Sequence, residues 1–90
     1  MKDRKATAEM IEDLYALLAT LEDATACREL LTDLCTDKEI EQMAGRVRAA
    51  KLLKEGKTYA EIIEQTDISS ATLSRVSRSL QYGDGYRKFL

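Results

Sequence analysis

TYAEIIEQTDISSATLSRVSRSL, residues 58–80, has the pattern of two short helices joined by a tight turn. Thr58 and Glu61 have the spacing of a capping box, in which each side chain pairs with a free backbone amide at a helix start. Thr66 and Asp67 then interrupt the apolar run, and Asp tolerates left-handed backbone geometry better than most residues. Ser69 is placed to cap the next helix. The stretch therefore predicts a helix-turn-helix.

The second helix of this pair has two distinct faces. Its apolar row comprises Leu73, Val76 and Leu80, and Ile68 is expected to fill the corner of the turn. An outward row of small, hydroxylated and basic side chains comprises Ala71, Ser74, Arg75 and Arg78. No carboxylate lies between Asp67 and Asp84, so this row can approach phosphates and base edges without repulsion. The composition favours a DNA-recognition helix.

The alternative is a helical hairpin whose arginines simply face water. Two helix starts, a turn and a carboxylate-free face coincide, which favours the DNA-binding interpretation. The stretch departs from common helix-turn-helix patterns at two positions. Ile63 stands where a small residue is frequent, and Asp67 stands where glycine is frequent.

Length and composition predict one soluble all-α domain over residues 1–90. The sequence is 44% apolar and 33% charged, and it has no proline. We expect dimerisation helices in residues 1–35, a core helix in 36–56, the helix-turn-helix in 58–80 and a tail in 81–90. A domain of 90 residues buries a limited fraction of its surface, so association with a partner subunit is expected.

Charge is distributed unevenly along the chain. Residues 1–44 carry five basic and eleven acidic side chains, whereas residues 45–90 carry nine basic and five acidic ones. The positive charge therefore accompanies the helix-turn-helix, although the total is −2. A polyanionic partner is plausible, because local potential governs the approach to phosphates.

The remaining helices are predicted from apolar spacing and caps. A helix over about 6–22 has a wide apolar face, which belongs either to a subunit interface or to the intrachain core. The residues of this face are Met10, Ile11, Leu14, Tyr15, Leu17, Leu18 and Leu21. A helix over about 25–34 should pack on it through Cys27, Leu30, Leu31 and Leu34. A capping box of Thr36 and Glu39 opens a third helix that Gly56 ends, with an apolar face of Ile40, Met43, Ala44, Val47, Ala50 and Leu53.

Two further groups of residues lie on the third helix and in the tail. The third helix carries four basic side chains, which either lie along the protein surface or reach DNA phosphates. They are Arg46, Arg48, Lys51 and Lys54. After a turn over 81–85, residues 86–90 are expected to form a last helical turn that returns Phe89 and Leu90 to the core.

Several functional classes are not expected. No run is long and apolar enough for a bilayer span, and the first residues lack the apolar core of a signal peptide, so a cytoplasmic protein is predicted. Cys27 and Cys35 have neither zinc-site nor disulfide spacing, and we interpret them as buried apolar residues. There is no histidine, phosphate-binding glycine loop or nucleophile elbow, so an enzyme is not predicted.

The chain resembles a known family in two stretches, LLTDLCTDKEIEQMAGRVRAAKLLKEG (30–56) and SSATLSRVSRSL (69–80). Residues 31–80 are similar to the bacterial Trp repressor family, particularly its YerC/YecD-type branch. The resemblance implies a Trp repressor-like bundle of five to six helices in an intertwined homodimer. Two helix-turn-helix units would then read successive major grooves of a near-palindromic operator in double-stranded DNA.

The resemblance also implies a site for a small-molecule corepressor. Trp repressors hold tryptophan between two arginines, which Arg46 and Arg75 match, and Thr36 and Ser79 match residues at the ligand's polar end. Val76 stands where the family has glycine, and its branched side chain should fill space that the indole ring needs. Tryptophan itself is therefore not predicted. Either another small molecule binds, or the protein binds DNA without a ligand.

The leading hypothesis is a transcriptional regulator, and more specifically a repressor. The residues expected at DNA are Lys57, Thr58, Tyr59, Ser69, Ser70, Ala71, Thr72, Ser74, Arg75 and Arg78. Two alternatives remain open: a protein-interaction module that uses the same helix pair, and a metabolite sensor without DNA binding.

Overall fold

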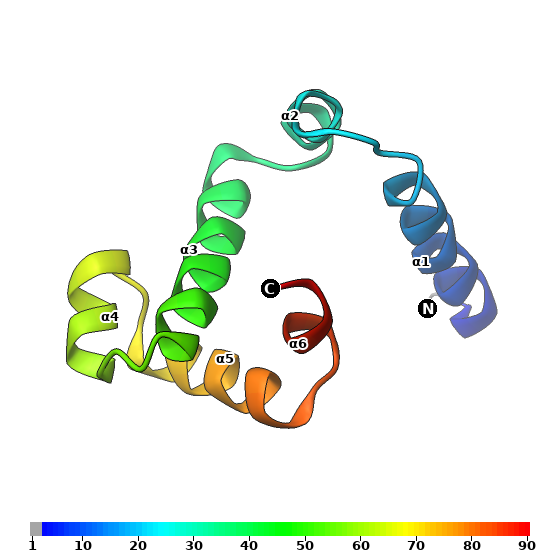
Figure 1. Cartoon of the computed structure of the whole chain (residues 1–90). Helices are drawn as coiled ribbons and strands as arrows, with labels where there is room; N and C mark the ends of the chain where they lie inside the picture. Colours follow the sequence, from blue (N-terminus) through cyan, green and yellow to red (C-terminus); the bar gives the residue numbers. More distant parts are fainter. Residues whose placement is uncertain (1–2) are drawn as a thin grey trace. The chain divides into compact units, whose positions relative to one another are not determined.

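The computed structural model describes residues 3–90, and every regular element in that range is a helix (Figure 1). The helices are α1 (Arg4–Leu18), α2 (Ala24–Leu34), α3 (Asp37–Lys54), α4 (Tyr59–Thr66), α5 (Ser70–Tyr82) and α6 (Gly85–Phe89). The predicted all-α class is confirmed. The first two residues of the predicted 1–35 segment lie outside the described range.

The chain divides into two units, with the boundary in the sequence between Cys35 and Thr36. The first unit contains α1 and α2, and the second contains α3 to α6. Within the second unit α3 packs against both α4 and α5, α4 packs against α5, and α5 packs against α6 (Figure 1). Helix α3 is therefore the platform that holds the predicted helix-turn-helix.

Small side chains on α3 allow this close packing. The buried core of the second unit comprises Ala49, Ala50, Leu52, Ile62, Leu73 and Val76. One turn earlier on α3, a Cβ added to Gly45 would lie 3.1 Å from Cγ2 of Ile68. Ile68 packs against the core, as predicted for the corner residue. The turn between α4 and α5 thus lies directly against α3.

Both predicted capping boxes are present. The amide of Glu39 donates to the hydroxyl of Thr36 at 3.1 Å, and the amide of Thr36 donates to Oε1 of Glu39 at 2.8 Å. The amide of Glu61 donates to the hydroxyl of Thr58 at 3.2 Å, and the amide of Thr58 donates to Oε2 of Glu61 at 2.9 Å. These bonds satisfy amides that have no partner within a helix, so they fix where α3 and α4 begin.

The predicted ends and turn are also confirmed. Gly56 follows α3 with a φ of 85°, a conformation that glycine adopts without strain. Asp67 ends α4 in the left-handed region, with φ 58° and ψ 21°. Ser69 caps α5 by accepting a hydrogen bond of 3.1 Å from the amide of Thr72. The two helices are therefore joined by a short turn with one left-handed residue.

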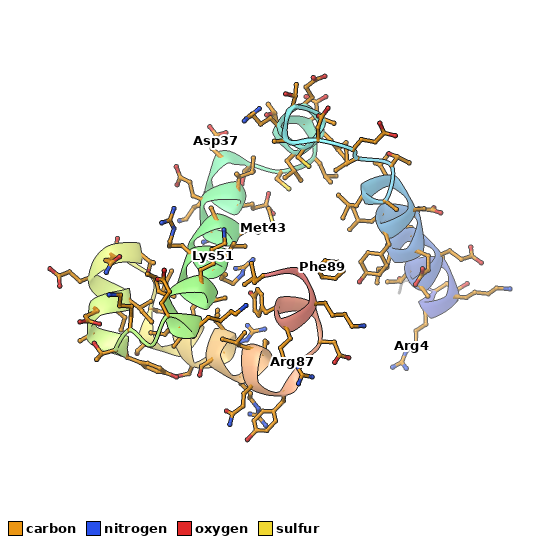
Figure 2. All side chains as sticks on the ribbon, in the orientation of Figure 1. Arg4, Asp37, Met43, Lys51, Arg87 and Phe89 are labelled. Carbon is orange, nitrogen blue, oxygen red and sulfur yellow. The ribbon has the colours of Figure 1, made fainter. Side chains whose placement is uncertain are left out.

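The predicted apolar face of α3 is partly wrong. Ala50 and Leu53 contact the core, but the other buried positions are Ala49 and Leu52. Ala44 and Val47 are exposed, and Ile40 and Met43 are half-buried. Figure 2 shows Met43 projecting from α3 on the side opposite α4. Helix α3 has apolar residues on more than one side, and the side with two adjacent alanines is the one that α4 and α5 can approach most closely.

Helix α1 ends earlier than predicted, at Leu18 instead of residue 22. The hydroxyl of Thr20 donates to the carbonyl of Leu17 at 2.7 Å, and the amides of Thr20 and Leu21 bond to carbonyls three residues back. This tightening ends the α-helical pattern. Asp23 then caps α2 by accepting a bond of 2.8 Å from the amide of Ala26.

The apolar face of α1 is not covered within the first unit. Met10, Ile11, Leu14, Tyr15 and Leu17 are 38–57% exposed. Neither α1 nor α2 has a buried residue, and these two helices make at most a marginal contact. The prediction that α2 packs on α1 is therefore wrong. Cys27 and Cys35, predicted to be buried, are half-buried, as are Leu30 and Leu31, and Leu34 is exposed.

The tail forms α6, and of the two residues predicted to return to the core Leu90 does and Phe89 does not. Tyr86 and Leu90 pack against it, whereas Phe89 is 85% exposed and projects on the side away from α3 (Figure 2). The Lys54 ammonium donates to the carbonyl of Leu90 at 2.7 Å, which ties the tail to α3. The prediction for Phe89 is wrong, because a five-residue helix has room for only one inward row.

Candidate nucleic-acid interface

The outward row of α5 is exposed along its whole length. Ala71, Ser74, Arg75 and Arg78 are exposed, and so is Ser70 in the first turn of the helix. On the opposite side Leu73 and Val76 are buried, which fixes the rotation of the helix. This row combines small side chains, which allow close approach, with two guanidinium groups, which attract phosphates.

The hydroxyl groups at the start of α5 are not equivalent. The Ser69 hydroxyl donates to the hydroxyl of Thr72 at 2.9 Å and also accepts the amide of Thr72. Its single hydrogen is therefore already engaged in capping. Thr72 is half-buried, and its hydroxyl accepts from Ser69, so its own hydrogen is free to donate to a ligand. Of these two hydroxyls, that of Thr72 is the better donor to an external group.

Lys57, Thr58 and Tyr59 form a second exposed segment, at the start of α4. Thr58 accepts the amide of Glu61, which leaves its hydroxyl hydrogen available. The backbone amides at a helix start and the helix dipole both favour an anion at this position. The Glu61 carboxylate already bonds to the Thr58 amide at this helix start. The segment can therefore contact a phosphate backbone through the Lys57 ammonium and the Thr58 hydroxyl.

Beside the outward row, α5 forms one wall of a cavity of about 460 Å³. Its lining residues are Arg46, Thr72, Arg75, Val76, Ser79 and Tyr86. The structure thus brings together four of the five residues predicted for a ligand: Arg46, Arg75, Val76 and Ser79. Val76 lines the cavity and yet is only 2% exposed, because its side chain belongs to the core.

Thr36, the fifth predicted ligand residue, does not line this cavity. It caps α3, and Arg46 lies ten residues further along the same helix, roughly 15 Å away at 1.5 Å per residue. A small ligand held by Arg46 cannot also reach Thr36 of the same chain.

Sequence reasoning did not assign Tyr86 to the ligand site and assigned Thr72 only to DNA. Tyr86 enters the site because α6 folds back against α5. No local pattern indicates that packing. Thr72 could have been found from spacing, because Thr72, Arg75, Val76 and Ser79 form an i, i+3, i+4, i+7 row. Arg75 belongs both to this row and to the outward row, so it lies between the cavity and the candidate DNA surface.

No carboxylate neutralises the arginines of the cavity. Within residues 3–90 one ion pair is present, between Arg87 and Asp84 at 3.1 Å on the exposed surface of α6, and it involves neither arginine of the cavity. The six residues that line the cavity include no Asp or Glu. Arg46 and Arg75 therefore bring two positive charges to a lining without a carboxylate, and an anion can offset them; Arg46 also borders a neighbouring pocket that Glu41 and Asp67 line.

The other basic residues of α3 differ in their surroundings. Arg46 is half-buried at the cavity, and Lys54 is bonded to the carbonyl of Leu90. Arg48 and Lys51 are exposed. The four basic residues of α3 therefore do not share one role, either as surface residues or as phosphate contacts.

Comparisons with known protein families and solved structures support the helix-turn-helix fold described above. The family model described as Trp repressor protein matches residues 9–90. The chain belongs to the Trp repressor family. The match extends well beyond residues 31–80, where the resemblance was noted, and includes most of α1 and all of α2.

Relatives of this family match over nearly the whole chain. An uncharacterized protein, YerC, from Bacillus subtilis (strain 168) is 38% identical over 91 residues, which cover 100% of this chain and 88% of YerC. The crystal structure of a TrpR-like protein from Eubacterium eligens has a TM-score of 0.84 at 38% identity, covering 96% of this chain and 90% of that protein. A crystal structure of a candidate Trp repressor from Staphylococcus aureus has a TM-score of 0.85 at 38% identity, covering 100% and 91%.

Membership of the Trp repressor family and the helix-turn-helix geometry indicate a DNA-binding regulator and not an enzyme. In the part of the chain that the structure describes, no helix is both long and apolar enough to cross a membrane.

Proposed function

We propose that this protein is a cytoplasmic transcriptional repressor that binds double-stranded DNA as a homodimer. The observation that carries the proposal is the exposed, carboxylate-free row of α5, held by packing on α3 at the second helix of a helix-turn-helix. Such a helix can enter a major groove with its N-terminal half against the bases.

The residues divide into two roles. Ser70, Ala71, Thr72 and Ser74 meet base edges, with water-mediated contacts where the side chains are short. Backbone phosphates are contacted by the remaining predicted residues: Lys57, Thr58, Tyr59, Ser69, Arg75 and Arg78. Ser69 contributes chiefly by capping α5, since its hydroxyl hydrogen is bonded to Thr72.

The exposed apolar face of α1 supports the homodimer. Five large apolar side chains on one short helix favour cover by another subunit, because their exposure in water is costly. A two-fold dimer presents two copies of α5, and these fit half-sites about 34 Å apart on a near-palindromic operator. In such a dimer Thr36 can reach a ligand only at the site of the other subunit.

The cavity beside α5 supports gating by a small molecule. Arg75 is common to the cavity and to the outward row, so a ligand there changes the surroundings of a residue that contacts DNA. The alternative is that Val76 closes enough of the site for the dimer to bind DNA without any ligand.

The decisive experiment is selection of bound duplexes from a random DNA pool by the purified full chain. It is carried out at about physiological salt, with and without a mixture of amino acids. A palindrome enriched without additives establishes a regulator that needs no corepressor, and enrichment only with amino acids establishes ligand gating by an amino acid. If no sequence is enriched in either arm, sequence-specific DNA binding under these conditions is refuted.

A second candidate function is docking of another protein. The exposed aromatic rings of Tyr82 (74%) and Phe89 (85%) favour it, because such side chains are frequent at protein interfaces. DNA binding by the purified chain alone, with an affinity that falls steeply as salt rises, would argue against this candidate.

A further inference from the structure

We propose that the cavity beside α5 binds a compact organic dianion, either a dicarboxylate or a phosphate monoester, instead of an aromatic amino acid. The proposal names the ligand class of the regulator proposed above, and its regulatory meaning rests on that function. Ligand binding itself can be tested without DNA. The cavity holds about 460 Å³, which is sufficient for a small metabolite.

Charge is the first argument. Two guanidinium groups, those of Arg46 and Arg75, line one cavity without a carboxylate among the lining residues. Arg46 is half-buried, so solvent screens its charge less than that of a fully exposed arginine. Each guanidinium can bind one carboxylate, or one edge of a phosphate, through paired hydrogen bonds. A ligand with two negative charges offsets both arginines, whereas a monocarboxylate or a zwitterion leaves one unpaired.

The neutral residues of the cavity are hydrogen-bond donors that suit oxygen ligands. Thr72 and Ser79 contribute hydroxyl groups and Tyr86 contributes a phenol. The hydrogen of the Thr72 hydroxyl is free, because this group accepts from Ser69. Three residues with neutral donors and two with cationic ones therefore line a single space, where carboxylate or phosphate oxygens can accept from them.

Shape is the third argument, and it excludes a bulky ring. Val76 is 2% exposed, and its side chain packs against the core formed by residues such as Ala49 and Leu73. The valine side chain therefore belongs to the core, and the other residues that line the space all carry polar groups. An indole ring buried there would lose water contacts without gaining an apolar slot. A compact, charged ligand avoids this cost.

The test measures ligand binding to the full chain in the absence of DNA, by calorimetric titration and by thermal stabilisation at constant ionic strength. The dianionic probes are succinate, glutarate and glycerol 3-phosphate. Acetate, L-tryptophan and added sodium chloride are the controls. We expect saturable binding of at least one dianion, at least tenfold tighter than acetate, and no binding of tryptophan. The dicarboxylate and phosphate arms identify which of the two anion types is preferred.

Two arginine variants locate the site. Arg46→Gln should weaken dianion binding about ten- to hundredfold, as expected for loss of a charged hydrogen-bonding partner. Arg87→Gln is the matched control, because Arg87 is exposed on α6 and pairs with Asp84 away from the cavity lining; it should bind dianions like the natural chain. If Arg46→Gln does not fold, Arg46→Lys replaces it. Lysine keeps the charge without the paired geometry, so binding should fall by a smaller factor.

Three results would overturn the proposal: no dianion binding beyond the sodium chloride control, equal binding by the natural chain and Arg46→Gln, or tryptophan binding tighter than every dianion. If no dianion binds while Arg46→Gln weakens DNA binding, the cavity holds a DNA phosphate and the proposal is likewise wrong. Dianion binding in a protein that selects no duplex even when that dianion is present would refute DNA recognition and leave the ligand proposal intact.

Discussion

Arg78→Gln should weaken DNA binding, and the loss should be largest at low salt. Arg78 is exposed on the outward row of α5, and the cavity does not include it, so the substitution removes a cation from the DNA surface without touching the ligand site. Glutamine keeps much of the length and helix propensity of arginine. The change therefore isolates the contribution of charge.

The salt dependence of the affinity gives the expected magnitude. Each phosphate that a cationic side chain neutralises contributes a slope of about −0.9 to a plot of log affinity against log salt. A homodimer loses two such contacts, so the slope should become about 1.8 less steep. Between about 50 and 200 mM salt this corresponds to a roughly twelvefold change in the ratio of natural to variant affinity. A protein that binds DNA as a single chain would show only about a 3.5-fold change.

Fluorescence anisotropy with the selected duplex, measured at several salt concentrations, provides both affinities and slopes. Arg87→Gln is again the control, since it removes the same charge from α6 and should leave the slope unchanged. If affinity and slope are the same for Arg78→Gln and the natural chain, Arg78 does not contact DNA and the assignment of the outward row is wrong.

Three further predictions concern stability. Leu73→Ala empties a fully buried position and should lower the free energy of unfolding by about 2–5 kcal/mol in denaturant titrations; a loss below about 1 kcal/mol would contradict the core assignment. Gly56→Ala should cost about 1–2 kcal/mol because of the φ of 85°, whereas Gly85→Ala, which meets no atom within 4 Å and has no positive φ, should not. Hydrogen bonds from the Thr36 amide and hydroxyl hold the pKa of Glu39 below its ordinary value of 4.5. The stabilisation is therefore fully present above pH 4.5 and is lost as pH falls through the lowered pKa, so Glu39→Gln should make stability less sensitive to acid in that range.

Local chemistry made much of the second unit predictable. A capping box, a helix-ending glycine or a left-handed Asp involves residues a few positions apart, and the hydrogen bonds of Thr36 and Thr58 formed as their spacing indicated. The two faces of α5 were equally readable, because Leu73 and Val76 are its fully apolar inward positions.

Features that depend on distant parts of the chain were not predictable. Helix α3 has apolar residues on several sides, and periodicity does not reveal which side its own chain covers; hence Ala49 and Leu52 were missed and Val47 was wrongly included. Tyr86 packs against the core and Phe89 is exposed, because the five-residue helix α6 directs one of the two side chains inward and the other outward. The other ligand residues were predicted from the family resemblance. Tyr86 was not predicted, because it reaches the cavity only through the packing of α6 on α5.

The order of helix contacts also bears on how fast the protein reaches its native state. In the second unit α3 packs on α4, α4 on α5 and α5 on α6, which are neighbours in sequence. Longer loops are closed by the α3 and α5 pair and by the bond from Lys54 to Leu90. Such local topologies fold in microseconds to milliseconds. The sequence contains no proline, so no slow prolyl isomerisation can delay refolding. A slow refolding phase would then report the meeting of two chains, and its rate should rise in proportion to protein concentration.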